Sequence, residues 1–125
     1  MKRKGLFVLD TTGGSEVVAL QKETKRYHGS VYTWECTSFN PITNRCCFAI
    51  HFKRPGERTR KNAFTYDWRL WSMAEVREML TESGFSKTIV YWEKDDGKGG
   101  GSGEFYPTEK AEECESWIAS IAALP

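Results

Sequence analysis

The chain has 125 residues, of which 39% are hydrophobic and 28% are charged, and its formal net charge is +1. This composition is ordinary for a soluble globular protein, and the length suits one domain with a modest core. A net charge near zero gives no overall field that would attract a polyanion. No apolar run approaches the roughly 20 residues that a membrane helix needs. We therefore expect one domain over residues 1–125, cytoplasmic and without a membrane span.

The cysteines indicate a reducing compartment. No Cys-x-x-Cys pair occurs, and the histidines do not fall at the spacing of a zinc site. We interpret each thiol as a small buried hydrophobic group and expect no metal site. The residues concerned are Cys36, Cys46, Cys47, Cys114, His28 and His51.

A continuous apolar run, Gly5–Leu9, ends at Asp10. Such a run is typical of a strand buried on both faces, in a parallel sheet covered by helices. A serine-capped amphipathic helix over about Glu16–Tyr27 is predicted to follow a Gly-Gly turn. Ligands of such sheets lie at the carboxyl ends of strands, so Asp10, Thr11 and Thr12 are candidate site residues by position. Asp10 could equally just end the strand and bind turn amides.

The next segment has the pattern of an antiparallel hairpin. Val31–Phe39 and Arg45–Lys53 alternate like strands, and the turn-forming cluster Asn40–Asn44 joins them. One face of this hairpin is more apolar than the other, so we expect it to pack against another layer. His51 lies on the more polar face, and we interpret it as structural.

The loop after the hairpin is basic, with Arg54, Arg58, Arg60 and Lys61 opposed by a single glutamate. Such side chains can contact phosphates. A solvated hairpin tip is the commoner meaning of such a loop, and no base-stacking motif accompanies it. We therefore rank nucleic acid as an unlikely partner.

Phe64–Trp71 is the densest aromatic run of the chain. Strand alternation puts one set of side chains on each face. The second set combines an acid, a guanidinium and an indole, which could form a substrate wall with arginine binding an anion and tryptophan stacking. An Asp67–Arg69 surface pair beside a core tryptophan explains the pattern equally well. The two sets are Phe64, Tyr66, Trp68, Leu70 and Thr65, Asp67, Arg69, Trp71.

A short amphipathic helix is predicted over about Met73–Ser83, since Ser72 and Glu75 form a capping box and a glycine follows the last turn. Thr88–Trp92 is β-branched and aromatic, which predicts a strand. Glycine-rich residues then suggest a mobile loop at 93–103. The pattern of the tail, residues 111–124, fits a helix or a buried strand.

The order of these pieces resembles the C-terminal half of a Rossmann-like S-adenosylmethionine-dependent methyltransferase. The resemblance rests mainly on the Gly-Leu-Phe-Val-Leu-Asp run and on the helix that closes on Ser-Gly-Phe. It makes Leu6–Asp10 the fifth sheet strand, Met73–Ser83 the following helix, Thr88–Trp92 the sixth strand and Trp117–Leu124 the antiparallel seventh. The implied fold is α/β: a partial Rossmann-like methyltransferase sheet, strands five to seven with helices, carrying an inserted antiparallel β-hairpin.

The family binds S-adenosylmethionine in the half that would precede Met1, and neither its glycine-rich loop nor its ribose-binding acid has a counterpart here. The resemblance therefore implies an acceptor-side half that is inactive alone, with positioning as its main contribution to methyl transfer. It assigns no catalytic residue. The implied acceptor-binding residues are Asp10, Thr11, Tyr66, Trp68, Arg69 and Trp71.

The partners implied are a small-molecule methyl acceptor and a protein chain that completes the sheet. The Leu6–Leu9 strand would lack one neighbour, and an exposed apolar edge invites pairing with a second chain or with another copy. Two other functions stay open. The chain could be a non-catalytic interaction module derived from a methyltransferase fold, or, ranked last, a nucleic-acid contact module.

Overall fold

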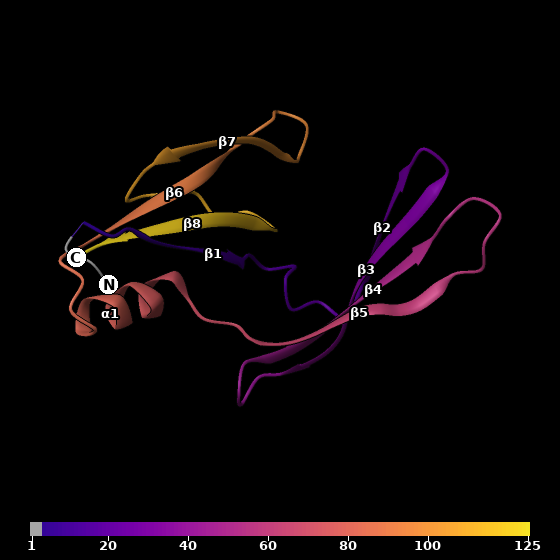
Figure 1. Ribbon diagram of the computed structural model, residues 1–125, viewed down its shortest axis with the longest axis horizontal. Coiled ribbons are helices and arrows are strands. Elements are labelled where there is room, and N and C mark those ends of the chain that lie inside the picture. Colours follow the sequence, from indigo (N-terminus) through magenta and orange to yellow (C-terminus); the bar gives the residue numbers. More distant parts are fainter. Residues whose placement is uncertain (1–3) are drawn as a thin grey trace. The chain divides into compact units, whose positions relative to one another are not determined.

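The computed structural model describes residues 4–125, which fall into two compact units. The first unit contains the residues up to Val17 together with Trp71–Pro125, and the second contains Val18–Leu70. Each unit has its own four-stranded sheet, and Figure 1 shows the strands of both with the single helix of the described chain.

The sheet of the first unit consists of β1 (Phe7–Gly13), β8 (Trp117–Leu124), β6 (Lys87–Asp95) and β7 (Gly101–Pro107), in that order. Every neighbouring pair is antiparallel. The last strand of the chain therefore lies between β1 and β6, which run parallel to each other without pairing.

One helix, α1 (Met73–Glu82), packs on this sheet. It begins at a complete capping box, in which the Ser72 hydroxyl accepts from the Glu75 amide and the Glu75 carboxylate accepts from the Ser72 amide. Leu80 is the buried residue of the helix, and it packs in a core with Val90 and Ile121. Ala119 and Ala123 of β8 complete this core.

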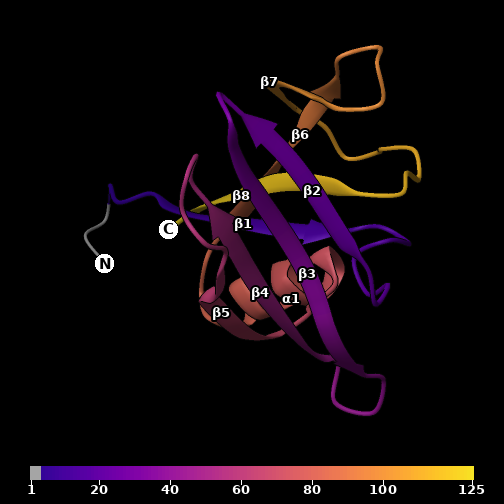
Figure 2. The ribbon, with the colours of Figure 1, turned by 90° about the vertical axis from the view of Figure 1, so that its right-hand side faces the viewer.

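The second unit is a meander of β2 (Lys22–Tyr27), β3 (Ser30–Asn40), β4 (Arg45–Lys53) and β5 (Arg60–Arg69). All its pairs are antiparallel, as Figure 2 lets the reader follow. The turn between β3 and β4 is stabilised by Asn40, whose Oδ1 accepts from the Ile42 amide at 2.9 Å. Asn44 adopts φ 58°, a left-handed conformation that asparagine tolerates.

The predicted α/β class is wrong. The structure is mostly β, with 55% strand and 8% helix, and it consists of two antiparallel four-stranded sheets and one short helix rather than a Rossmann-like sheet. The predicted two-stranded insertion forms β3 and β4, the two central strands of a four-stranded sheet, and β7 occupies part of the expected glycine-rich loop.

Two wrong predictions for the start of the chain account for much of this difference in fold class. The Gly5–Leu9 run leads into an edge strand whose sole neighbour in the described sheet is the antiparallel β8, and Phe7 and Val8 are exposed rather than buried. The predicted helix over Glu16–Tyr27 is absent, because turns precede the strand β2. Cross-strand pairing overrides helical periodicity there, as in the 3.2 Å contact between the hydroxyls of Thr24 and Thr33.

The elements with local sequence signals were predicted correctly. The helix expected over Met73–Ser83 is α1, and the strand expected over Thr88–Trp92 is the centre of β6. The hairpin at residues 31–53 is β3 and β4. Trp117–Leu124, which local periodicity left open, is the strand β8, and it is antiparallel to both neighbours. No helix in the described part of the chain has the length and apolar character that crossing a membrane requires.

Candidate functional site: an aromatic face of the second unit

Four aromatic side chains gather on one face of the β3–β4–β5 sheet. Because Phe48 is in register with Tyr66, and Cys46 with Trp68, alternate residues of three strands project to the same side. The Trp34 ring stacks on Phe48 with centroids 4.8 Å apart, and the Tyr66 and Trp68 centroids lie 4.6 Å apart. We call Trp34, Phe48, Tyr66 and Trp68 the aromatic face.

The aromatic face has a buried base and an exposed top. Phe48 is 2% exposed, whereas Trp68 is 43% exposed although it lies 5.7 Å from Phe48 and 6.2 Å from Trp34. Aromatic pairs at these separations stabilise each other beyond their area of burial. The result is an ordered indole surface open to solvent, on which a planar or cationic group could stack.

Two buried thiols lie beside these rings. Cys36 and Cys46 are 5% and 0% exposed, and their sulfur atoms lie 3.1 Å apart across the β3–β4 pair. Burial, and then the hydrogen bond with Cys36, raise the pKa of the Cys46 thiol to about 12. The Cys46 thiol is therefore uncharged at neutral pH and a poor nucleophile there.

The opposite face of the same sheet is polar. Arg45 donates two hydrogen bonds to Asp67, at 3.1 and 3.0 Å, and this pairing holds the pKa of the Asp67 carboxyl below its usual range. Asp67 thus forms a cross-strand pair with Arg45, which the sequence pattern did not predict. Both partners are largely exposed, so the pair contributes little to stability.

His51 also lies on this polar face, and both of its ring nitrogens are engaged. Nε2 lies 2.6 Å from a carboxylate oxygen of Glu35, and Nδ1 is 2.9 Å from the backbone amide of Asn62. Because an amide can only donate, Nδ1 accepts and the ring proton is on Nε2. His51 lies at the β-bulge where the β4–β5 register shifts, and its contact with Glu35 connects this bulge to β3. This arrangement supports the structural interpretation of His51.

The structure brings together only part of the predicted acceptor site. Tyr66 and Trp68 belong to the aromatic face. Arg69 is the last residue of β5, and Trp71 belongs to the other unit, so the alternation predicted over Phe64–Trp71 does not extend along one strand. The sequence pattern did not place Trp34 and Phe48 of the hairpin beside Tyr66. Which side chains become neighbours across strands depends on the strand register, and alternation along one strand does not determine that register.

Asp10 and Thr11 lie on β1 in the first unit. Asp10 accepts a hydrogen bond from the Ser120 hydroxyl at 2.6 Å, and Thr12 donates one to the Trp117 carbonyl at 2.9 Å. Thr11 is in register with Ala119. Asp10 and Thr12 thus bond β1 to β8, an arrangement that explains both side chains without a ligand.

The resemblance places S-adenosylmethionine in a half that would precede Met1, and the glycines after β1 show whether this turn could hold the cofactor instead. A Cβ atom at Gly13 would collide with the indole of Trp117, and one at Gly14 with the backbone carbonyl of Glu115. Protein atoms therefore fill the space that these glycines leave. The turn does not fit a cofactor cradle, and no step of a reaction is assigned to a cofactor at this position.

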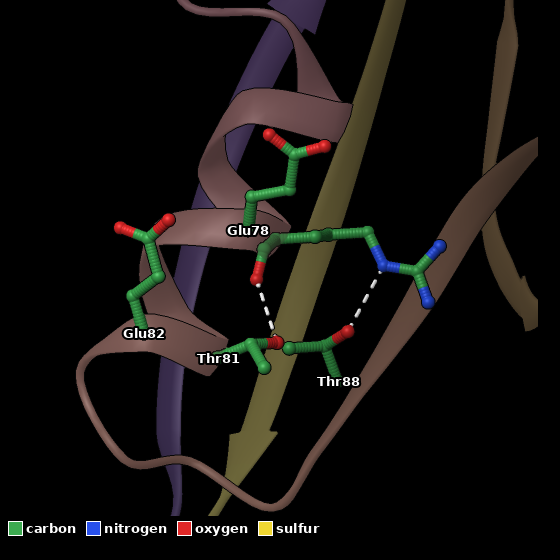
Figure 3. Close-up of a pocket in the computed structure, with 5 residues that line it drawn as sticks. Glu78, Thr81, Glu82 and Thr88 are labelled. Atoms are coloured by element: carbon green, nitrogen blue, oxygen red, sulfur yellow. Dashed lines mark hydrogen bonds between the residues drawn. The ribbon is translucent and has the colours of Figure 1, made fainter.

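Two shallow hollows lie elsewhere. One of about 420 Å³ lies between α1 and β6 (Figure 3), where Arg77 Nε donates to the Thr88 hydroxyl at 2.9 Å and the Thr81 hydroxyl donates to the Arg77 carbonyl. The guanidinium also forms two bonds to Glu109, at 2.8 and 3.1 Å, so its donors are engaged within the protein. The other hollow, of about 480 Å³, lies beside Phe105 and Tyr106. The described residues contain no cluster of ligands suited to a metal ion.

Comparison with known proteins adds no assignment, because no known family and no curated protein matches the chain.

Proposed function

We propose that this chain is the acceptor-side part of an S-adenosylmethionine-dependent methyltransferase, and that it is inactive without a separate cofactor-binding part. The observation that carries the proposal is the aromatic face, in which Trp68 is exposed and held against Tyr66. Both residues are among those for which the resemblance implies contact with the acceptor. The substrate class that suits this surface is a small molecule with a planar or apolar region.

The first unit gives the proposal a second support. The helix α1 and the strands β6 and β8 occupy the segments that the resemblance assigns to its last helix and strands, and β8 is antiparallel as expected of the seventh strand. Local sequence signals predict α1 and β6 as well, but they did not decide the tail, so only the agreement at β8 is independent of them.

The filled turn after β1 supports the second half of the proposal. Gly13 and Gly14 accommodate Trp117 and Glu115 rather than a ligand. This turn therefore offers no cofactor cradle, which agrees with cofactor binding by a separate part.

Methyl transfer after co-expression tests this proposal. The chain is co-expressed with the polypeptide encoded immediately upstream of Met1, and the purified complex is supplied with S-adenosylmethionine labelled at its methyl group and a panel of small aromatic acceptors. We expect labelled product. We also expect Trp68→Ala to reduce kcat/KM by about 5- to 150-fold, since a lost stacking contact of about 1–3 kcal/mol corresponds to such a factor.

The matched control is Phe64→Ala, which removes another exposed aromatic side chain of β5, 62% exposed, that forms none of the ring contacts described above. An equal loss in both variants would show a general effect on β5. A complex that transfers no label, with either the natural or the altered chain, would contradict the proposal.

One observation favours a second function, that of a non-catalytic interaction module. The start of the first unit exposes Leu6 and Val8 at 59% and 54%. Adjacent exposed apolar side chains of this kind mark contact surfaces. A stable complex with another protein, without any affinity for S-adenosylhomocysteine, would favour this function over methyl transfer.

A further inference from the structure

The two sheets have four edge strands, and β1 differs from the other three. Edge strands normally carry charges, proline or glycine that prevent pairing with another chain. The other edge of the same sheet, β7, begins with a glycine, contains a second glycine and a glutamate, and ends at Pro107. The edge strands β2 and β5 of the second unit are rich in charged residues. The start of β1 reads Phe-Val-Leu, and Phe7 and Val8 are 41% and 54% exposed. In the described sheet, no strand pairs with the far side of β1.

The sequence around this edge is complementary to itself. β1 begins at Phe7, and residues 4–6 precede it outside the described sheet. With these residues continuing the extended backbone of β1, an antiparallel pair of two copies of residues 4–10, centred on Phe7, places Leu6 of each copy opposite Val8 of the other. Lys4 of each copy then lies opposite Asp10 of the other. These four residues alternate with Phe7, so all of them project to one face, and directly opposed side chains in such a pair are in contact. An apolar centre would thus be flanked by two ion pairs.

Gly5, Phe7 and Leu9 project to the opposite face of the pair, where they are also complementary to one another. There, Phe7 of one copy meets Phe7 of the other, and Gly5 lies opposite Leu9, which leaves room for the larger side chain. This is the face on which Leu9 packs in the core with α1, and the Phe7 ring lies 5.8 Å from that of Phe85. The second copy would therefore extend both the sheet and its core.

We propose that the free edge of β1 pairs with β1 of a second copy of this chain, antiparallel and centred on Phe7, to give a closed two-fold dimer. The charge complementarity of Lys4 and Asp10 favours this register over one centred on Val8, which would place Asp10 opposite Leu6. One isologous contact uses both free edges, so the assembly ends at two chains. The inference rests on this edge alone and does not depend on the proposed methyltransferase function.

Sedimentation equilibrium over a wide range of concentration tests the dimer. We expect the mass to rise from the 14.3 kDa of one chain to twice that value and no further. Val8→Lys should keep the chain monomeric, because two lysines would face leucines in the pair. Ile118→Lys is the matched control, since Ile118 is 50% exposed on β8 and away from the edge, and it should still dimerise.

Charge reversal and cross-linking test the register. Lys4→Glu and Asp10→Lys should each weaken the dimer at low salt, and the double variant should recover most of the loss. In a Cys114→Ser background, Phe7→Cys should form a disulfide between copies under mild oxidation by a small-molecule disulfide, releasing two small thiols, whereas Val8→Cys should not. Circular dichroism of each variant confirms that it folds.

A monomer at every concentration would overturn the proposal, as would a dimer that Val8→Lys leaves intact. Open-ended oligomers would also overturn it, because they require an interface that does not close. A different polypeptide that occupies this edge and prevents self-association of the natural chain at its working concentration would overturn it as well.

Discussion

Nε2 of His51 lies 2.6 Å from Oε2 of Glu35, and the other ring nitrogen accepts from the Asn62 backbone amide. This one side chain therefore connects β3 and β4 to the start of β5. We expect His51→Leu to lower the free energy of unfolding of the second unit by about 1–3 kcal/mol, since it leaves a carboxylate and an amide without their partner. Urea denaturation followed by tryptophan fluorescence measures the change.

The control for His51→Leu is His28→Asn. His28 is exposed and adopts φ 47°, a conformation that asparagine also accepts, so this change should alter stability little. Equal stability of the natural chain and His51→Leu would show that the imidazole bonds contribute nothing.

The raised pKa of the Cys46 thiol should affect how the stability of the second unit depends on pH. Its folded-state pKa of about 12 lies above its ordinary value of 9.0, so the folded state holds the thiol proton more tightly than the unfolded state. The contribution to stability is therefore complete below about pH 9 and is lost as the pH rises toward 12. Cys46→Val should make the decline in this window shallower, as measured by denaturation at a series of pH values. Cys114→Ser, a change at an exposed thiol, should leave the decline as it is.

The core of the first unit depends on Leu80. This side chain is 8% exposed and packs with Val90 and Ile121. Leu80→Ala should lower the free energy of unfolding by about 2–5 kcal/mol through lost burial and the cavity that remains. Met79→Ala on the same helix, at a residue that is 38% exposed, should cost clearly less. Thermal unfolding of the two variants checks the order, and the reverse order would contradict the assigned helix face.

The turn after β1 should not tolerate a side chain at Gly13. A Cβ there meets the rigid indole of Trp117, so Gly13→Ala should cost about 1–3 kcal/mol by overpacking. Gly100→Ala is the control, because the nearest atoms belong to the carboxylate of Asp96, which can move away. An unchanged unfolding temperature for Gly13→Ala would mean that Trp117 does not pack in this position.

Sequence patterns predicted the elements whose signals are local. The Ser72–Glu75 capping box predicts the start of α1 at Met73. The glycine after the last turn predicts its end to within one residue. The Asn40–Asn44 turn defines the hairpin in the same way. These signals depend on backbone groups close in sequence, so they hold whatever the rest of the fold does.

Strand direction and pairing could not be predicted in this way. An apolar run such as Phe7–Leu9 is compatible with a buried parallel strand and with an edge strand, and the choice depends on β8, which is more than 100 residues away. The same holds for the aromatic face, because Trp34 and Trp68 meet only through the registers of β3, β4 and β5. The Lys22–Tyr27 segment shows the converse, since its helical periodicity was overridden by pairing with β3.

Calorimetric titration with S-adenosylhomocysteine tests the central claim most directly. It is performed on the chain alone and on the chain co-expressed with the polypeptide encoded upstream of Met1. We expect no heat of binding for the chain alone and saturable binding for the complex. Micromolar binding by the chain alone would contradict the division into acceptor and cofactor parts, and no binding by either sample would contradict the methyltransferase function.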